Sequence, residues 1–373
     1  MHEYSGLLGL GRIDVTAGAL LVLAGAVSNA QSVVSRNLRA VDLRLEEEFT
    51  AIGSVRELRD GRVLIVDPEE NRCVVANLRS GAVTAVGRVG SGPKEFRRVG
   101  TLFALRDDST LLTDPGNRRW LLLDGTNIVG SVSATDGALT LGRLRGTDTS
   151  GHVLAEKYPP RNWNNADAAT ESVYVVRGDR VNGRGDTVAR TLSHPVKIEN
   201  SASGRGAPRV FEQPLSAAEQ AVMFGDGWVA VVRLNPYRID VIPPRGATIR
   251  GKALPDPMVR VDAAEKRAHM ERMSRKTGGV VRDASYFPVW PPTASPFRDD
   301  ALVVGPAGQL FILKMQTLAS PGTRYDIVDR LARLVGTMTL PENQRIVGFG
   351  KRAVYVAVTD SVGIQRLVRH PWP

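Results

Sequence analysis

An internal repeat constrains the fold of this chain more than any other feature of its sequence. The segment Leu58–Pro68 recurs 47 residues later as Leu105–Pro115, and the similarity extends to Arg72 and Arg119. Each copy contains a turn, an apolar run, an aspartate, a second turn and a second apolar run. Units of this size cannot bury their own hydrophobic faces, so they stack against one another. The repeat therefore predicts a fold of stacked β-modules.

Short runs rich in Val, Ile, Leu and Tyr, bounded by Gly, Asp, Asn and Pro, dominate the rest of the chain, as is typical of an all-β protein. In each module a near-continuous apolar strand is followed, further out, by an alternating strand. Radially arranged blades require this gradient. A β-sandwich would also alternate but would not repeat a whole strand-turn-strand cassette. We predict an all-β, six-bladed β-propeller, with modules beginning near Val63, Thr110, Val153, Met223, Gly308 and Phe349.

Two further segments belong to the predicted propeller. Val41, Leu43 and Leu45 alternate with polar residues, and we expect this segment to close the last blade, since ring closure removes exposed sheet edges. Val259–Lys276 lacks Pro and Gly and carries apolar residues at helical spacing. It predicts a helical insertion at about 257–277, between blades four and five. The helix is expected either to brace one rim or to form a lid over the central channel.

The N-terminus resembles a secretory leader. Arg12 precedes the apolar stretch Ala17–Val27, which is too short to span a bilayer, and the small residues Ser28–Ala30 follow. We expect residues 1–30 to be a signal peptide and residues 31–373 a single propeller domain. With Cys73 as the only cysteine, no intramolecular disulfide can form. The expected location is the bacterial periplasm or exterior, with no membrane span.

The chain is basic, with a net charge of +10, which favours anionic surfaces and partners. Only eight of its 49 basic residues are Lys, and an excess of Arg is also what a biased genome composition produces. The charges are dispersed, without a Lys/Arg run or an interleaved basic and aromatic stripe. Nucleic-acid binding is therefore not expected.

The segment between the two best-preserved modules carries a family signature. Gly87–Phe96 resembles the Gly-x-x-Gly-x-Gly-Pro-Gly-Glu-Phe junction of NHL-repeat six-bladed β-propellers, which occur in many exported bacterial proteins. Asp114–Arg119 and Leu121–Asp124 resemble the segment that follows that junction. Lys94 departs from the family, which has Gly there. The resemblance covers roughly residues 49–125 and implies the fold. It implies no single function, because such propellers serve as binding platforms, lactonases, lyases and receptor sensor modules.

Two kinds of metal chemistry are implied by the enzymes of this class. Lyase-type propellers use several histidines in the channel, whereas His152, His194 and His269 are far apart here and are expected at the surface. Lactonase-type propellers hold calcium with oxygen ligands from different blades. Asp67, Asp114, Asn117 and Asn235 are candidates, but the equivalent repeat positions of Asp67 and Asp114 favour carboxylates that tie turns to backbone N–H groups. We predict no cofactor, with calcium as the alternative, and single out no catalytic residue.

Two Pro-stiffened loops are better suited to recognition, Tyr158–Asn165 and Tyr286–Pro292. If both reach one rim, Trp163 and Trp290 form the walls of a site for a sugar, peptide or aromatic ligand, and arginines pair its anionic group. Packing between blades is the alternative for both tryptophans. The predicted ligand-binding residues are Arg161, Trp163, Asn164, Tyr237, Arg238 and Trp290.

Together these features favour an exported, non-enzymatic binding or scaffolding propeller. Its partner, a protein, a small molecule or a carbohydrate, is expected on the rim loops or at the channel mouth. The alternative is a calcium- or zinc-dependent hydrolase or lyase. The lining of the channel separates the two: convergent carboxylates or histidines favour chemistry, and Leu, Val and Arg favour a binding or plugged channel.

Overall fold

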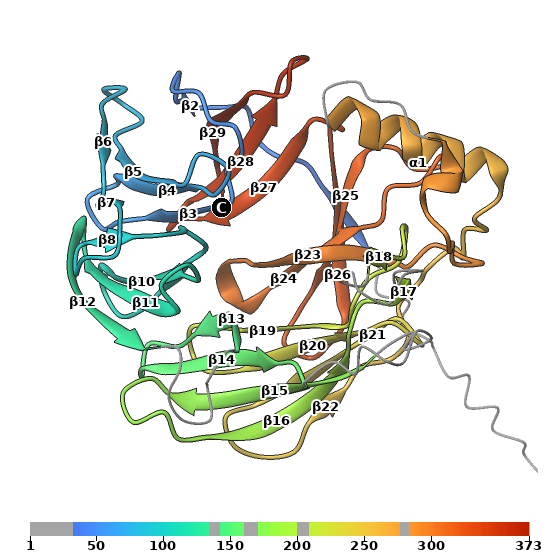
Figure 1. The fold of residues 1–373 in the computed structure, drawn as a ribbon, viewed down its shortest axis with the longest axis horizontal. Helices are drawn as coiled ribbons and strands as arrows, with labels where there is room; N and C mark the ends of the chain where they lie inside the picture. The colour runs from blue at the N-terminus through green and yellow to red at the C-terminus, as the bar shows by residue number, and fades with distance from the viewer. Residues whose placement is uncertain (1–32, 134–141, 160–170, 200–208, 277–282, 373) are drawn as a thin grey trace, which may run out of the picture. The chain divides into compact units, whose positions relative to one another are not determined.

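Six antiparallel sheets are arranged around a central axis as the blades of a propeller (Figure 1). The computed structural model describes residues 33–372 except 134–141, 160–170, 200–208 and 277–282. In each blade four strands, or three in the last blade, follow one another in chain order, each pairing with the next, and the last two blades each add one strand from the N-terminus. The predicted all-β, six-bladed architecture is confirmed.

The first three blades contain four strands each. Blade one consists of β3 (Ser54–Glu57), β4 (Val63–Asp67), β5 (Arg72–Ala76) and β6 (Val83–Ala85). Blade two consists of β9 (Leu102–Ala104), β10 (Ser109–Asp114), β11 (Arg119–Asp124) and β12 (Asn127–Ser133). Blade three consists of β13 (Arg143–Thr147), β14 (His152–Lys157), β15 (Ser172–Asp179) and β16 (Gly185–Leu192).

The last three blades follow the same order, and two of them take a strand from the N-terminus. Blade four consists of β19 (Gln220–Met223), β20 (Val229–Arg233), β21 (Arg238–Ile242) and β22 (Ile249–Arg250). Blade five consists of β23 (Phe297–Val304), β24 (Leu310–Lys314), β25 (Thr323–Val328), β26 (Leu334–Leu340) and β1 (Val34–Arg36). Blade six consists of β27 (Gln344–Phe349), β28 (Ala353–Thr359), β29 (Gln365–Pro371) and β2 (Leu43–Arg44).

The ring is closed on its inside and on its outside. Each inner strand (β3, β9, β13, β19, β23 and β27) contacts the next, and β27 returns to β3. On the outside, β2 pairs antiparallel with β29, so the predicted closing segment is confirmed. The chain just before it, β1, pairs in parallel with β26 of blade five. The N-terminal segment therefore ties two blades together, and Leu45 and Phe49 bury their side chains almost completely.

The second strand of each blade forms the core. All five residues of β4 and of β24 are buried, and hydrophobic clusters fill the junctions between neighbouring blades. This near-continuous burial explains why these strands read as apolar runs, since both faces pack against another blade. The sequence pattern placed them innermost, whereas the structure adds another strand, of mixed polarity, inside each one.

The repeated aspartates act as turn anchors. Asp67 accepts bonds from the backbone N–H groups of Thr50 and Glu69 at 2.8 and 3.0 Å. Asp114 accepts bonds from Arg97 N–H at 3.0 Å and from Arg119 Nε at 3.2 Å. Both carboxylates are fully buried. They hold the connection that precedes each blade against the turn between its second and third strands.

The predicted helical insertion is confirmed as α1 (Ala263–Lys276), which lies in the chain between β22 and β23. The buried Glu265 accepts a bond from Leu318 N–H at 2.8 Å, and Arg272 donates to the Gln316 carbonyl at 3.2 Å. These contacts brace the connection between β24 and β25. The remaining elements are short: β7 (Arg88–Val89), β8 (Glu95–Phe96), β17 (Val196–Glu199), β18 (Arg209–Glu212), η2 (Ala284–Tyr286) and η3 (Pro306–Gly308). In the described part of the chain, no helix is long and apolar enough to cross a membrane.

Candidate functional site

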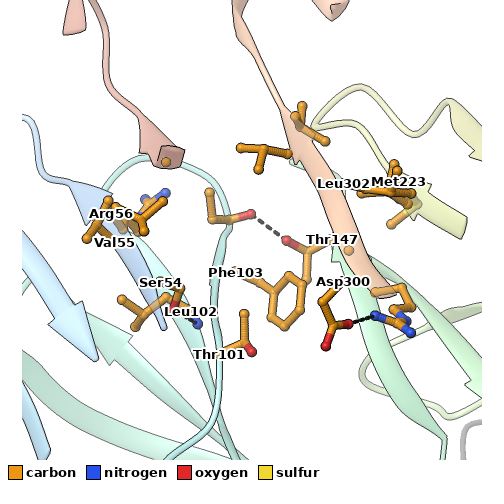
Figure 2. A pocket seen from close by; sticks show the side chains of 18 of the residues that line it. Ser54, Val55, Arg56, Thr101, Leu102, Phe103, Thr147, Met223, Asp300 and Leu302 are labelled. Carbon is orange, nitrogen blue, oxygen red and sulfur yellow. Dashed lines mark hydrogen bonds and ion pairs between the residues drawn. The ribbon is translucent and has the colours of Figure 1, made fainter. Parts of the chain in front are cut away.

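The six inner strands surround a cavity of about 580 Å³ (Figure 2). Every blade contributes to its lining. The volume falls within the range of small-molecule sites, and the cavity lies on the axis of the propeller.

One end of the cavity is formed where the inner strands begin. Arg345, at the start of β27, donates from Nη2 to the Ile52 carbonyl just ahead of β3, at 2.7 Å. Gln220, the first residue of β19, donates to the Arg298 carbonyl of β23 at 2.6 Å. These contacts bring the first residues of strands from several blades to the same end, which gathers a set of charged side chains. We call this set the arginine mouth; Arg143, Arg145, Asp300 and Arg345 line the cavity, and Arg298 lies close behind them without lining it.

Two arginines of the mouth share one carboxylate oxygen. Arg143 Nη2 and Arg145 Nη1 lie 2.6 and 2.9 Å from Asp300 Oδ1. Arg145 also pairs through Nε with the buried Glu156 at 2.7 Å. Burial opposes ionisation of Asp300, yet Arg143 and Arg145 hold the pKa of its carboxyl below the ordinary value. The ion pairs of Arg143 and Arg145 with Asp300 therefore join blade three to blade five, across the beginning of β19.

Asp300 projects from a distorted stretch of β23. The register of β23 shifts between Phe297 and Leu302, and Asp300 has a φ of 51°. Aspartate is one of the few residues other than glycine that enter this left-handed region readily. Gln220 bridges the bulge, because its side chain donates to Arg298 and accepts from Ala301 N–H at 3.0 Å. Bulges of this kind re-aim side chains next to functional sites.

The other two arginines of the mouth lack a directly paired carboxylate among the described residues. Within the described residues, neither Arg298 nor Arg345 forms an ion pair with a carboxylate, although both lie within electrostatic range of Asp300. Burial lowers the pKa of both guanidinium groups, and the nearby charge of Arg298 lowers the pKa of Arg345 further. Partly buried cations without a counter-charge are costly. They are the groups that an incoming anion would satisfy.

Below the mouth the cavity becomes apolar. Figure 2 shows Val55, Phe103, Met223 and Leu302 around it, on four different blades. At the far end the charged groups are occupied by the protein itself: Arg56 donates to the carbonyls of Asp107 and Ser109, and Glu57 accepts from the Tyr355 hydroxyl at 2.6 Å. Arg56, like Arg345, forms no ion pair with a described residue, so arginines without a carboxylate partner lie at both ends of the cavity.

Three of the six residues predicted from the loops, Arg161, Trp163 and Asn164, lie outside the described residues. The chain leading to them leaves β14 beside the mouth: the Tyr158 hydroxyl lies 3.5 Å from Glu156 Oε2. Burial raises the pKa of Tyr158, and the Glu156 carboxylate adds to the shift.

The other three are placed in two separate environments. The buried Tyr237 donates to Asp326 Oδ2 at 2.9 Å, with the Lys314 ammonium 4.2 Å from its ring, and Arg238 pairs with Asp240 at 3.1 Å. Trp290 donates to the Ala284 carbonyl at 3.0 Å and packs edge-on against His269 of α1 at 5.7 Å between ring centroids. Neither group lines the cavity. A ligand site built from these residues remains a prediction.

His152, His194 and His269 each contact a different neighbouring side chain. His152 lies 2.8 Å from Asp148, His194 lies 3.3 Å from Asp299, and His269 contacts Trp290. Burial raises the pKa of Asp299. Over the ranges that the structure describes, no three His, Cys, Asp or Glu side chains are grouped so as to hold a metal ion.

One comparison with a solved structure supports the fold, and two more give lower scores. A member of the DUF4221 family from Bacteroides vulgatus superposes with a TM-score of 0.50 at 9% identity, over 89% of this chain and 97% of the other. A protein from Bacteroides fragilis, provisionally described as exported, gives 0.47 at 12%, over 90% and 98%. Virginiamycin B lyase from Staphylococcus aureus gives 0.43 at 12%, over 87% and 97%. No family model and no curated protein matches this chain in sequence.

Proposed function

We propose that this protein is a binding propeller whose ligand carries an anionic group and docks at the arginine mouth. One observation carries the proposal: Arg143, Arg145 and Arg345 face one end of a cavity that all six blades line. Arginine is the residue best suited to bind a carboxylate or a phosphate, because its planar fork donates two parallel hydrogen bonds. Inside the mouth, Arg143 and Arg145 already pair with one carboxylate oxygen of Asp300.

The wider assignment is proposed on sequence features. The apolar N-terminal stretch Ala17–Val27 supports an exported protein, and the Gly87–Phe96 junction supports a propeller of the NHL-repeat type. In the junction, Glu95 accepts a bond from Gly92 N–H at 2.7 Å, which closes the tight turn that its glycines predict. A binding or scaffolding role outside the cytoplasm fits a channel lined by Arg, Val and Leu.

The proposal is tested by calorimetric titration of the full chain with acetate and with inorganic phosphate. Replacing Arg345 with glutamine is expected to weaken binding about 10- to 100-fold, the value of one hydrogen bond to a charged group. Arg324→Gln is the matched control, since Arg324 is similarly half-buried and makes one hydrogen bond, to Ser320, away from the cavity. Equal affinities of the two variants, or no saturable binding to the wild-type protein, would contradict the proposal.

We also propose that the site works without a metal cofactor. EDTA is then expected to leave both the melting temperature and the acetate affinity of the full chain unchanged. Elemental analysis of the purified protein provides the second readout. Stoichiometric calcium or zinc, together with a clear drop in melting temperature on chelation, would favour a metal-dependent propeller instead.

A further inference from the structure

We propose that the ligand of the channel is an amphiphilic carboxylate, with its headgroup at the arginine mouth and a slender apolar body between the inner strands. This inference rests on the proposed function and adds the chemical class of the ligand. Three features of the cavity carry it: the way the mouth holds a carboxylate, the apolar lining below the mouth, and the shape set by six converging strands.

The headgroup is argued from Asp300. Its carboxylate is held by two guanidinium groups at 2.6 and 2.9 Å, so the mouth demonstrably accepts this chemical group. The cation nearest to a second carboxylate would be Arg345, which has one hydrogen bond, to Ile52, and no ion pair with a described residue. A singly charged headgroup suffices there. A polyanion would add its charge beside Asp300, which stays ionised because its pKa is lowered.

The apolar body is argued from the residues that follow the mouth along each inner strand. Val222 on β19, Leu302 and Val304 on β23, and Val55 on β3 all line the cavity and are half-buried. By comparison, every residue of β4 and of β24 is buried. Burying the remaining apolar surface of this lining is favourable in proportion to its area.

The dimensions limit the body to a narrow one. From Asp300 to Val304, β23 advances roughly 13 Å at the usual rise of a strand. Along this length the six inner strands enclose a cavity of about 580 Å³. A hydrocarbon chain or a single aromatic ring fits this space in a lengthwise orientation. A wide polar ligand such as an oligosaccharide would leave its hydroxyl groups against Val and Leu, without partners.

The test is a calorimetric series on the full chain with straight-chain carboxylates from acetate to octanoate. Each methylene buried between the inner strands is expected to tighten binding about fourfold. Val222→Thr keeps the side-chain shape but replaces one methyl with a hydroxyl, so it should weaken octanoate binding about tenfold more than acetate binding. Val304→Thr is a second variant of the same kind. Val83→Thr, on the outer strand β6 and away from the cavity, is the matched control.

The outcomes separate the two levels of the proposal. Octanoate that binds no more tightly than acetate, with both still dependent on Arg345, would overturn the amphiphile and leave the anion site standing. Octanoate binding that survives both Arg345→Gln and Val222→Thr would show adsorption elsewhere and overturn it as well. If neither carboxylates nor inorganic phosphate bind the wild-type chain, the proposed function fails, and the amphiphile fails with it.

Discussion

Replacing Asp300 with asparagine is expected to tighten the binding of acetate about tenfold. The carboxylate of Asp300 occupies Arg143 and Arg145 in the free protein and repels a second anion close by. At the effective dielectric of a protein surface, like charges about 5 Å apart repel by roughly 3 kcal/mol, and part of this is screened by solvent. A gain of about 1.4 kcal/mol corresponds to tenfold. Calorimetric titration of both proteins measures the difference.

The substitution is suited to this test because it preserves the backbone. Asparagine also enters the left-handed region that Asp300 occupies at a φ of 51°. Asp226→Asn is the control: Asp226 pairs with Arg330 and is similarly exposed, at 57% of its side chain against 60% for Asp300. Because the pKa of Asp300 is lowered from 3.8, this carboxylate stays ionised between pH 5 and pH 7. Mild acid should therefore not reproduce the gain. An Asp300→Asn protein that binds acetate more weakly would contradict the assignment.

Replacing Asp114 with alanine is expected to lower the free energy of unfolding by about 3–5 kcal/mol, the usual cost of removing one partner of a buried charged network. The carboxylate is fully buried and accepts bonds from the backbone of Arg97 and Arg98 and from the side chains of Asn117 and Arg119. Its loss removes the acceptor of the Arg97 and Arg98 N–H groups between blades one and two, while Asn117 and Arg119 keep bonds to other carbonyls. Urea unfolding followed by circular dichroism measures the change.

A neighbouring aspartate provides the comparison. Asp124, at the end of β11, is exposed, so Asp124→Ala should change stability by no more than about 0.5 kcal/mol. Asp114→Asn keeps one acceptor oxygen and is expected to fall between the two. A loss for Asp114→Ala as small as that for Asp124→Ala would show that the repeated aspartate is not a structural anchor.

The architecture was predictable from the sequence because two strands of every blade are buried on at least one face. Val63–Asp67 and Leu310–Lys314 read as apolar runs for this reason. The turn anchors Asp67 and Asp114 were predictable because they recur at the same place in the repeat. The helix Ala263–Lys276 was predictable from the helical spacing of its apolar residues and from the lack of Pro and Gly.

The candidate site was not predictable in the same way. Inner strands such as Ser54–Glu57 and Arg143–Thr147 are short and mix arginine with apolar residues, since one face lines a cavity and the other packs on the next strand. Arg143 and Arg345 are about 200 residues apart, and only the ring brings them to one mouth. The sequence signal for the cavity lining is an arginine a few residues ahead of a buried strand, as at Arg56, Arg145 and Arg345. The bulge that presents Asp300 has no such signal.

The most direct test of the central claim is to locate a bound carboxylate in the molecule. Crystals of the full chain soaked with para-bromobenzoate reveal the bromine by its anomalous scattering. The account predicts the carboxylate beside Arg345 at the arginine mouth, with the bromine inside the cavity near Val222 and Leu302. Bromine sites on the outer surface of the blades, with the mouth left empty, would contradict it.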